Sequence, residues 1–297
     1  MMSDAVYNRI KDEFIKSLEA GVAPWHKPWT PAVPMSMYSK KVYRGVNFFA
    51  LAMLGYKSVW WVTMTEVKKN GRVKEGCEKD YFPVLAPIMK KMEGADGSEF
   101  MHIVGVKYIN VYNKECVEGI EFPEENFLDF QPIDVLDAIF AAVPGNPNVV
   151  HRTEGECYYS PYSDKVVMQH RERFVDEKSY YRTRAHELIH WTGHPDRCNR
   201  TAIAEQVKNP LFTTFDIAAY SFEELVAEIG ATMLMARAGV QTGVESNSVA
   251  YVAHWLQYLK SSPPKLITQA AKAAQDAVDY LFGDKVKENE IAYSEAG

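Results

Sequence analysis

The run His186-Glu187-Leu188-Ile189-His190 combines residue types and a spacing that suit metal-dependent hydrolysis. Histidines four residues apart lie on one face of a helix, one turn from each other, where both imidazoles can bind the same metal ion. Glu187 lies beside that face, where its carboxylate can take a proton from water and return it to a leaving amine. The alternative is a helix with two packed histidines and a surface glutamate. The run predicts a zinc-dependent metallopeptidase site with His186 and His190 as metal ligands and Glu187 as the general base.

A zinc site of this kind needs a third protein ligand, and the sequence offers two candidates. Asp196 completes a local HExxHxxGxxD pattern. Glu224 lies in the run Ser221–Glu228, in which Glu224 and Glu228 are one turn apart on one helix face. There Glu224 would bind the metal, and Glu228 would orient a ligand histidine from behind. The alternative for Glu228 is a solvated helix face, and the residues alone leave both candidate ligands open.

Weaker candidates surround this motif. Four side chains have types that suit transition-state or supporting roles, although such residues are more often simply packed: His194, Tyr220, Tyr251 and His254. The expected metal is Zn2+, with Mn2+ as the alternative, because sites that contain carboxylates accept both. The sequence does not indicate which protein would be the substrate.

Charge and aromatic content set the first 80 residues apart. They contain 13 Lys/Arg and 8 Asp/Glu, whereas the whole chain has a net charge of -6. Four of the six tryptophans also lie there, among them Trp25, Trp29 and Trp60. Aromatic rings stack on unpaired bases while lysines and arginines contact phosphates, so this part of the chain predicts binding of single-stranded DNA. The alternative is that the tryptophans form the core of a small domain.

The elements that must position these residues follow from periodicity and turn residues. Helices are expected at 5–20, 47–54, 65–70, 135–142, 179–192, 221–238, 248–260 and 265–282, and strands at 59–62, 81–86, 102–112 and within 158–168. The acidic, proline-containing stretch 121–134 is typical of a linker. The fold class is therefore α+β with two domains. A small mixed domain is expected at 1–125, and a mainly helical domain with a small sheet at 126–297.

Cysteine spacing and hydropathy exclude other classes. The four cysteines, Cys77, Cys116, Cys157 and Cys198, are far apart and form no CxxC pair, which argues against a disulfide framework and against a cysteine zinc site. No stretch is long and apolar enough to span a membrane, and charges interrupt any signal peptide near the N-terminus. The expectation is a protein of the bacterial cytoplasm with no membrane partner.

Several longer runs resemble one known family, the ArdC-type antirestriction proteins of conjugative plasmids and phages, which are related to the N-terminal part of TraC-type primases. The runs that carry the resemblance are Gly21–Trp29, Tyr43–Asn47, Trp60–Thr63, Val73–Gly76, Val111–Asn113, Tyr180–His194 and Phe222–Gly230. The resemblance implies a domain that binds single-stranded DNA, followed by a zincin-like metallopeptidase domain. It also favours Glu224 over Asp196 as the third ligand.

The resemblance also implies a biological role, which is to protect DNA that enters as a single strand from host restriction. On this chain the implied DNA-binding residues are Trp25, Lys27, Trp29, Tyr43, Arg44, Asn47, Trp60 and Lys74. The protein substrate of the peptidase would be a component of host defence. Two other functions stay open: a DNA-binding protein that does not cleave protein and whose metal domain is structural, and an accessory factor for replication or priming.

Overall fold

The computed structural model describes residues 2–26, 33–93, 99–124, 135–208, 217–240 and 249–284, so Lys27 and Trp29 lie outside the described residues. The chain is α+β and has two domains, which form two compact units and are described separately. The first unit holds the chain up to Glu13 together with Ala32–Phe127, and the second holds Phe14–Pro31 and Leu128–Val286. The main change of unit lies close to the expected boundary at 125, but no pattern in the sequence indicates that residues 14–31 group with the second unit.

The N-terminal helix α1 (Met2–Glu19) forms because apolar residues recur every four positions. Val6, Ile10, Phe14 and Leu18 are all buried. Gly21 follows the helix with φ 78°, a left-handed conformation that glycine adopts without steric cost. The expected range is 5–20, and the buried stripe is the one that the sequence indicates.

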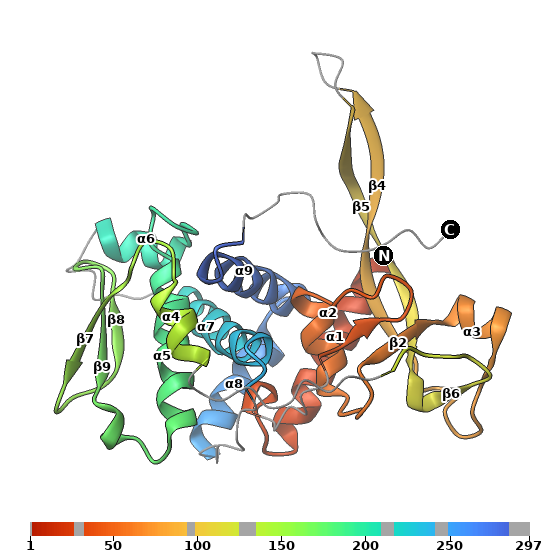
Figure 1. Cartoon of the computed structure of the whole chain (residues 1–297), viewed down its shortest axis with the longest axis horizontal. Coiled ribbons are helices and arrows are strands. Elements are labelled where there is room, and N and C mark those ends of the chain that lie inside the picture. The colour runs from red at the N-terminus through yellow and green to blue at the C-terminus, as the bar shows by residue number, and fades with distance from the viewer. Residues whose placement is uncertain are drawn as a thin grey trace. The chain divides into compact units, whose positions relative to one another are not determined.

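A four-stranded sheet in the order β1-β2-β5-β4 forms the centre of the first unit. Its strands are β1 (Met35–Ser36), β2 (Trp60–Thr63), β4 (Phe82–Glu93) and β5 (Glu99–Asn113). β1 pairs parallel to β2, and the other pairs are antiparallel. β4 and β5 run on past the other strands as a two-stranded ribbon (Figure 1). The helix α2 (Gly45–Met53) contacts β4, where Asn47 hydrogen-bonds both backbone groups of Leu85.

A smaller substructure follows at the end of β2 and β5. It consists of the helix α3 (Met64–Asn70), the strand β3 (Arg72–Val73), a 3-10 helix (Lys114–Cys116) and the strand β6 (Val117–Glu118). β3 and β6 pair antiparallel, so the chain just after β3 lies beside the chain just before β6. A cluster of buried apolar residues fills this part: Val62, Val67, Tyr112, Cys116 and Val117.

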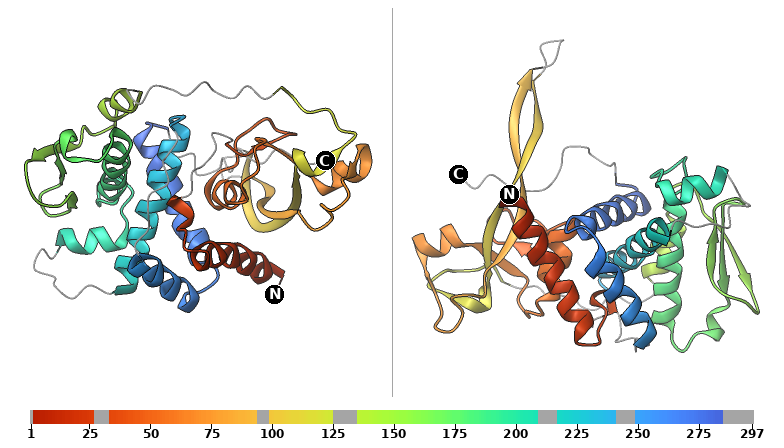
Figure 2. Two further views of the ribbon diagram at one scale, coloured as in Figure 1. Left: turned by 90° about the horizontal axis from the view of Figure 1, so that it is seen from below. Right: turned by 180° about the vertical axis from the view of Figure 1, so that it is seen from behind.

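The second unit is mainly helical. Its helices are α4 (Val135–Ala141), α5 (Glu177–Thr192), α6 (Thr201–Lys208), α7 (Ile217–Arg237), α8 (Val249–Ser261) and α9 (Leu266–Leu281). α5, α7 and α9 pack on one another (Figure 2). α5 also contacts a three-stranded sheet in the order β7-β9-β8, made by β7 (Asn148–Arg152), β8 (Tyr158–Ser160) and β9 (Lys165–Gln169).

The sheet of the second unit is mixed, since β7 pairs parallel and β8 antiparallel with the central β9. β8 therefore lies at one end of the sheet. Within the part of the chain that the structure describes, no helix is both long enough and apolar enough to span a bilayer.

Candidate metal centre

The helix α5 presents His186 and His190 on one face, one turn apart. The helix begins where the Asp176 side chain accepts a hydrogen bond from the Ser179 backbone nitrogen at 2.7 Å, and it ends at Thr192. The Nε2 atoms of the two histidines are 3.1 Å apart. This spacing brings both imidazoles to one point at the surface of the helix, and His190 is buried while His186 is partly exposed.

The third side chain at this point is Glu224 of α7. One carboxylate oxygen, Oε2, lies 3.5 Å from His186 Nε2, and the other, Oε1, lies 3.4 Å from His190 Nε2. Two ligands that bind a tetrahedral zinc ion at about 2.0–2.1 Å are themselves about 3.4 Å apart. The separation of the two nitrogens and the distance from each nitrogen to its nearer Glu224 oxygen are all close to this value. The residues fit a divalent cation with two nitrogen ligands and one oxygen ligand, and the fourth position is left for water or substrate.

The approach of α7 to α5 depends on Gly230. A Cβ atom at this position would lie 2.8–3.0 Å from three side-chain carbons of Ile189, closer than carbon atoms pack in proteins. Glycine therefore lets the backbone of α7 come near α5 two turns after Glu224. This close packing of two helices positions the carboxylate against the histidines.

A buried ion pair supports His190 from behind. Glu223 Oε1 lies 3.1 Å from His190 Nδ1, and the same carboxylate accepts hydrogen bonds from Arg200 Nη2 at 2.7 Å and Nε at 2.9 Å. Arg200 also donates to the hydroxyl of Thr192 and to the carbonyl of Ile189. A carboxylate that accepts from the second nitrogen of a ligand histidine fixes the ring and directs Nε2 toward a metal.

The charges of the site favour a cation. Burial alone would lower the pKa of His190, but the carboxylates of Glu223 and Glu224 outweigh burial and raise that pKa to about 10. Burial would raise the pKa of Glu224, but hydrogen bonds with His186 and His190 hold it well below its usual range. The carboxylates therefore stabilise positive charge at this point, whether a proton or a metal ion carries it.

Glu228 lies behind His186. Its carboxylate is 3.9 Å from His186 Nδ1 and forms an ion pair with Arg182 at 2.6 Å. Tyr251 donates a hydrogen bond to Glu228 at 2.7 Å, and Trp25 in turn donates to the Tyr251 hydroxyl at 2.8 Å. This buried chain of polar groups holds the carboxylate near the candidate ligand His186 and balances its charge.

Glu187 of α5 and Tyr220 of α7 are the other candidate groups of the site. Glu187 is mostly buried, with 7% of its surface exposed, whereas Tyr220 is about half exposed. Burial and the neighbouring carboxylates of Glu224 and Glu187 raise the pKa of Tyr220 to about 12, so its phenol stays protonated. Burial raises the pKa of the Cys157 thiol, just before β8, and the charge of Glu187 adds to this effect. β8 also contacts α5, the helix that carries Glu187.

The alternative ligand, Asp196, does not join the metal group among the described residues. Its side chain is 85% exposed and lies 3.4 Å from His194 Nδ1. His194 follows the end of α5, where its backbone nitrogen donates to the Trp191 carbonyl. His194 is therefore occupied with Asp196 in the turn after the helix. His254, another candidate, packs edge-on against Trp255.

Four of the DNA-binding candidates are buried, which contradicts direct stacking or contact in this structure: Trp25, Tyr43, Asn47 and Trp60. Trp25 is completely buried in the second unit, edge-on against Trp255 at 5.1 Å. The side-chain amide of Asn47 forms hydrogen bonds with the backbone of Leu85. Trp60 belongs to the strand β2, and the Lys40 ammonium lies 5.3 Å from the centre of its ring. Tyr43 and Trp60 are therefore core residues of the first unit, whereas Trp25 is a core residue of the second.

Lys74 and Arg44 are the described candidates that solvent reaches, since Lys74 is exposed and Arg44 is partly exposed. Lys74 lines an open hollow of about 430 Å³ together with Lys57, Lys114 and Phe122. Glu115 also lines it, but its carboxylate accepts hydrogen bonds from the backbone nitrogens of residues 57 and 58. The hollow therefore combines three ammonium groups, one carboxylate and an aromatic ring.

Sequence reasoning misses the contact of Glu223 with His190 and its partner Arg200, and it gives no role to Lys114. From the sequence, Glu223 fits a solvated helix face as readily as the site. A signal is present for Glu223, because a helix that also buries Leu225 and Ile229 must turn part of its acidic run inward. Nothing in the spacing points to Arg200, since it is 23 residues from its partner.

Comparisons with known proteins bear on both units. A family model described as zincin-like metallopeptidase matches residues 135–273, and a model described as the N-terminal domain of anti-restriction factor ArdC matches residues 4–111. The antirestriction ArdC protein of plasmid R388 is 32% identical. Its metal-free structure has a TM-score of 0.68 and an overlap of 94% of this chain and 97% of that chain. Its Mn(II)-bound structure has a TM-score of 0.70 and an overlap of 95% and 98%.

Curated relatives show the same likeness at lower identity. DNA primase TraC from Escherichia coli is 26% identical over 303 residues, which cover 95% of this chain and 27% of the primase. The chain thus spans about a quarter of the length of that relative. An uncharacterised protein of Sinorhizobium fredii (strain NBRC 101917 / NGR234) is 27% identical over 306 residues, with coverage of 96% and 95%.

Proposed function

The chain belongs to the ArdC family of antirestriction proteins, and on that premise we propose that its second unit is a metal-dependent peptidase and that its first unit binds single-stranded DNA. The single observation that carries the peptidase is the set of separations, 3.1, 3.4 and 3.5 Å, among His186, His190 and Glu224. Zn2+ suits this site, and Mn2+ is the alternative, in keeping with the Mn(II)-bound relative.

Each side chain has a definite task in peptide hydrolysis. A divalent cation held by the three ligands would supply a Lewis acid at this point. Glu187 takes a proton from the attacking water and then gives it to the nitrogen of the departing amine. The protonated Tyr220 phenol, which is exposed beside Glu224, can donate a hydrogen bond to the peptide oxygen as negative charge develops on it.

The outer edge of the sheet offers a place for an extended peptide. β8 ends the sheet order, so its outer edge can pair with an added strand. Because β8 contacts α5, which carries Glu187, such a peptide would lie near the base. The proposed substrate is therefore a protein segment that can become extended, which fits a component of host defence with an accessible loop.

The peptidase is tested with the full-length protein, loaded with Zn2+, on a mixture of peptides derived from a bacterial proteome. We expect new peptide N-termini by mass spectrometry, and a loss of about 10²–10⁴-fold in their rate of formation with Glu187→Gln. Glu205→Gln, an exposed glutamate that pairs with Lys208, is the matched control. Equal cleavage by the wild type and Glu187→Gln, or no cleavage by the wild type, would overturn the proposal.

The basic hollow supports the DNA-binding part of the proposal. Three lysines around an open surface can neutralise consecutive phosphates of a strand, and Phe122 offers a ring for a base. Residues 1–80 hold 13 Lys/Arg and 8 Asp/Glu, but residues 1–13 and 32–127 of the first unit hold 15 of each, so the positive charge is local to the hollow. Because the contact is electrostatic, affinity for single strands should fall steeply with salt and depend little on sequence.

Fluorescence anisotropy with labelled oligo(dT) over a range of salt concentrations tests this interface. The double variant Lys57→Glu/Lys74→Glu should bind more weakly. The slope of log K against log salt should decrease by about 1.4, since each lost phosphate contact removes about 0.7. Lys90→Glu/Lys107→Glu on the β4–β5 ribbon changes the charge equally and is the control. An equal loss in both double variants would rule out the hollow as the interface.

A further inference from the structure

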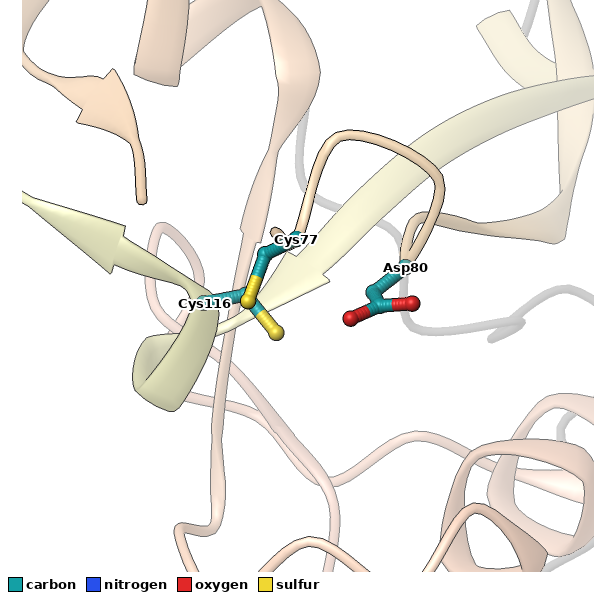
Figure 3. A group of neighbouring side chains, drawn as sticks. All are labelled: Cys77, Asp80 and Cys116. Atoms are coloured by element: carbon teal, nitrogen blue, oxygen red, sulfur yellow. The ribbon is translucent and has the colours of Figure 1, made fainter. Parts of the chain in front are cut away.

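A second cluster of metal-binding residue types lies in the first unit, far from the histidines in sequence. The ligand atoms of Cys77, Asp80 and Cys116 all lie within 4.8 Å of one another. Figure 3 shows the thiols of both cysteines side by side and the carboxylate of Asp80 directed toward them. The lack of a CxxC pair argues, from the sequence, against a cysteine zinc site. Spacing alone does not show that Cys77 and Cys116, which are 39 positions apart, lie side by side in the fold.

The backbone builds this cluster from two segments. β3 and β6 pair with Val73 opposite Val117, and the Lys74 backbone nitrogen donates to the Cys116 carbonyl at 3.0 Å. The chain then turns, since Cys77 donates from its backbone to Lys74 and Asp80 donates to Cys77, at 3.1 and 3.0 Å. Cys77 and Asp80 are therefore held on one tight turn against the 3-10 helix that carries Cys116.

The cluster has a closed side and an open side. Cys116 is 2% exposed within an apolar cluster, Cys77 is partly buried, and Asp80 is exposed. The hydroxyl of Tyr56 lies 3.4 Å from the Cys116 sulfur. An ion can thus enter past Asp80 and reach two sulfurs, with the phenol or a water molecule as the fourth group.

We propose that Cys77, Cys116 and Asp80 bind a second Zn2+ ion, which has a structural role and is separate from the metal centre of the second unit. Thiolates select zinc over Mg2+, Ca2+ and Mn2+, which prefer oxygen ligands. Tetrahedral zinc with sulfur at about 2.3 Å and oxygen at about 2.0–2.2 Å places its ligands about 3.5–3.8 Å apart. The ligand atoms of the cluster lie within 4.8 Å of one another, so zinc binding would draw them about 1 Å closer at most.

Ordinary packing accounts for only part of the cluster. Free cysteines often pack as small apolar residues, which describes Cys116 among its apolar neighbours. It does not by itself account for a carboxylate beside two thiols, which a protonated Cys77 would hold only through a weak S–H hydrogen bond. A cation between them satisfies all three groups. It also cross-links the turn after β3 to the 3-10 helix before β6, where two short strands provide little hydrogen bonding of their own.

Cobalt substitution separates this site from the histidine site. Co2+ bound to thiolates gives a charge-transfer band in the near ultraviolet, and the His186–His190–Glu224 site contains no sulfur. Full-length reduced protein is stripped of metal, titrated with Co2+ and then with Zn2+. We expect about two cobalt ions per chain, a thiolate band that saturates with one of them, and loss of the band when Zn2+ displaces the cobalt.

Variants assign the band to the cluster. Cys77→Ser and Asp80→Asn should abolish or strongly weaken it and lower the cobalt content to about one per chain. His186→Ala should keep the band and lose the other ion. Cys198→Ser and Glu78→Gln are the matched controls, because Cys198 is also partly buried and Glu78 lies on the same turn. Both Cys77 and Asp80 are at least partly exposed, so their variants should fold even if a Cys116 variant does not.

Three outcomes would overturn the proposal. One is the absence of a thiolate band in the wild type, and another is a band that survives both Cys77→Ser and Asp80→Asn. The third combines two observations. Mass spectrometry of protein purified under non-reducing conditions finds a Cys77–Cys116 disulfide, and the reduced cluster does not bind cobalt. That last result would make the cysteines a redox pair.

Discussion

At the scale of single residues, the metal centre depends on how its buried charges are paired. Glu223 is a buried carboxylate, and burial would raise its pKa. The charge of Arg200 and the hydrogen bond to His190 outweigh burial and lower that pKa. An unpaired charge at this depth would cost several kcal/mol, about 3–5 when one partner of a buried pair is removed. Glu223 and Arg200 therefore form a rigid support for the ligand histidine.

Glu223→Gln should lower the affinity for Zn2+ by about 10–100-fold, the usual effect of losing a partner behind a ligand histidine. Glutamine has the size of glutamate. Its neutral side chain cannot at the same time accept a hydrogen bond from the His190 ring nitrogen and balance the charge of Arg200. Competition with a zinc chelator measures the affinity, and Glu205→Gln is the control. An affinity equal to that of the wild type would mean that His190 needs no such support.

The sequence indicates the residues of the site unevenly. The spacing of His186, Glu187 and His190 is local, so one helix determines their arrangement. Glu224 requires a second helix, and the residues alone leave it open against Asp196. The prediction of Trp25 as a DNA contact is wrong. An aromatic residue beside lysines gives the same sequence pattern whether it lies in a core or on a binding surface. Only its partners, Tyr251 and Trp255, show that it is a core residue.

At the scale of elements, the site is a contact between α5 and α7. Glu224 and Gly230 lie on the same helix, and Gly230 sets how near that helix comes to α5. In a helix interior, alanine is normally about 1 kcal/mol more favourable than glycine. Here the added Cβ meets Ile189 at 2.8 Å, and overpacking in a core costs about 1–3 kcal/mol. The steric cost should therefore outweigh the gain in helix propensity.

Gly230→Ala should lower the melting temperature and weaken Zn2+ binding, because α7 must move away from α5 and take Glu224 with it. Thermal unfolding with and without Zn2+ measures both effects. Gly105→Ala is the control, since a Cβ there meets only one atom at an ordinary 3.5 Å. A variant more stable than the wild type with undiminished zinc binding would show that Ile189 adapts without moving the helix.

Long periodic elements can be predicted from the sequence, whereas short ones cannot. The observed helices α1, α5, α7 and α9 fall within a few residues of their expected ranges. α1 and α9 have an apolar stripe at helical spacing, whereas α5 and α7 are long runs without proline. The strand β7 is absent from the predictions because four of its five residues are exposed and no alternation marks it. The two-residue strands β3 and β6 leave no pattern at all, although they bring Cys77 and Cys116 together.

At the scale of the whole molecule, the chain contains two compact units with separate cores. Length and charge indicate two domains from the sequence. They do not assign residues 14–31, because the membership of these residues depends on long-range contacts such as the hydrogen bond between Trp25 and Tyr251. The proposed activities also divide between the units, with the basic hollow in the first and the metal centre in the second.

The two activities should therefore be separable by mutation. Glu187→Gln should keep the single-strand affinity and salt slope of the wild type, and Lys57→Glu/Lys74→Glu should keep the rate of peptide cleavage. Anisotropy and cleavage measured on the same samples test this. Loss of both activities in either variant would contradict independent sites. Protection of incoming DNA in cells that carry Glu187→Gln would indicate that DNA binding alone gives antirestriction.

The measurement that tests the metal centre most directly is a calorimetric titration of Zn2+ into stripped protein that carries Cys77→Ser, so that only the histidine site remains. We expect one ion per chain. The further change Glu224→Ala should abolish tight binding, and Asp196→Ala should leave it unchanged. Tight binding that survives Glu224→Ala but is lost with Asp196→Ala would contradict the site described here and establish the local aspartate as the third ligand.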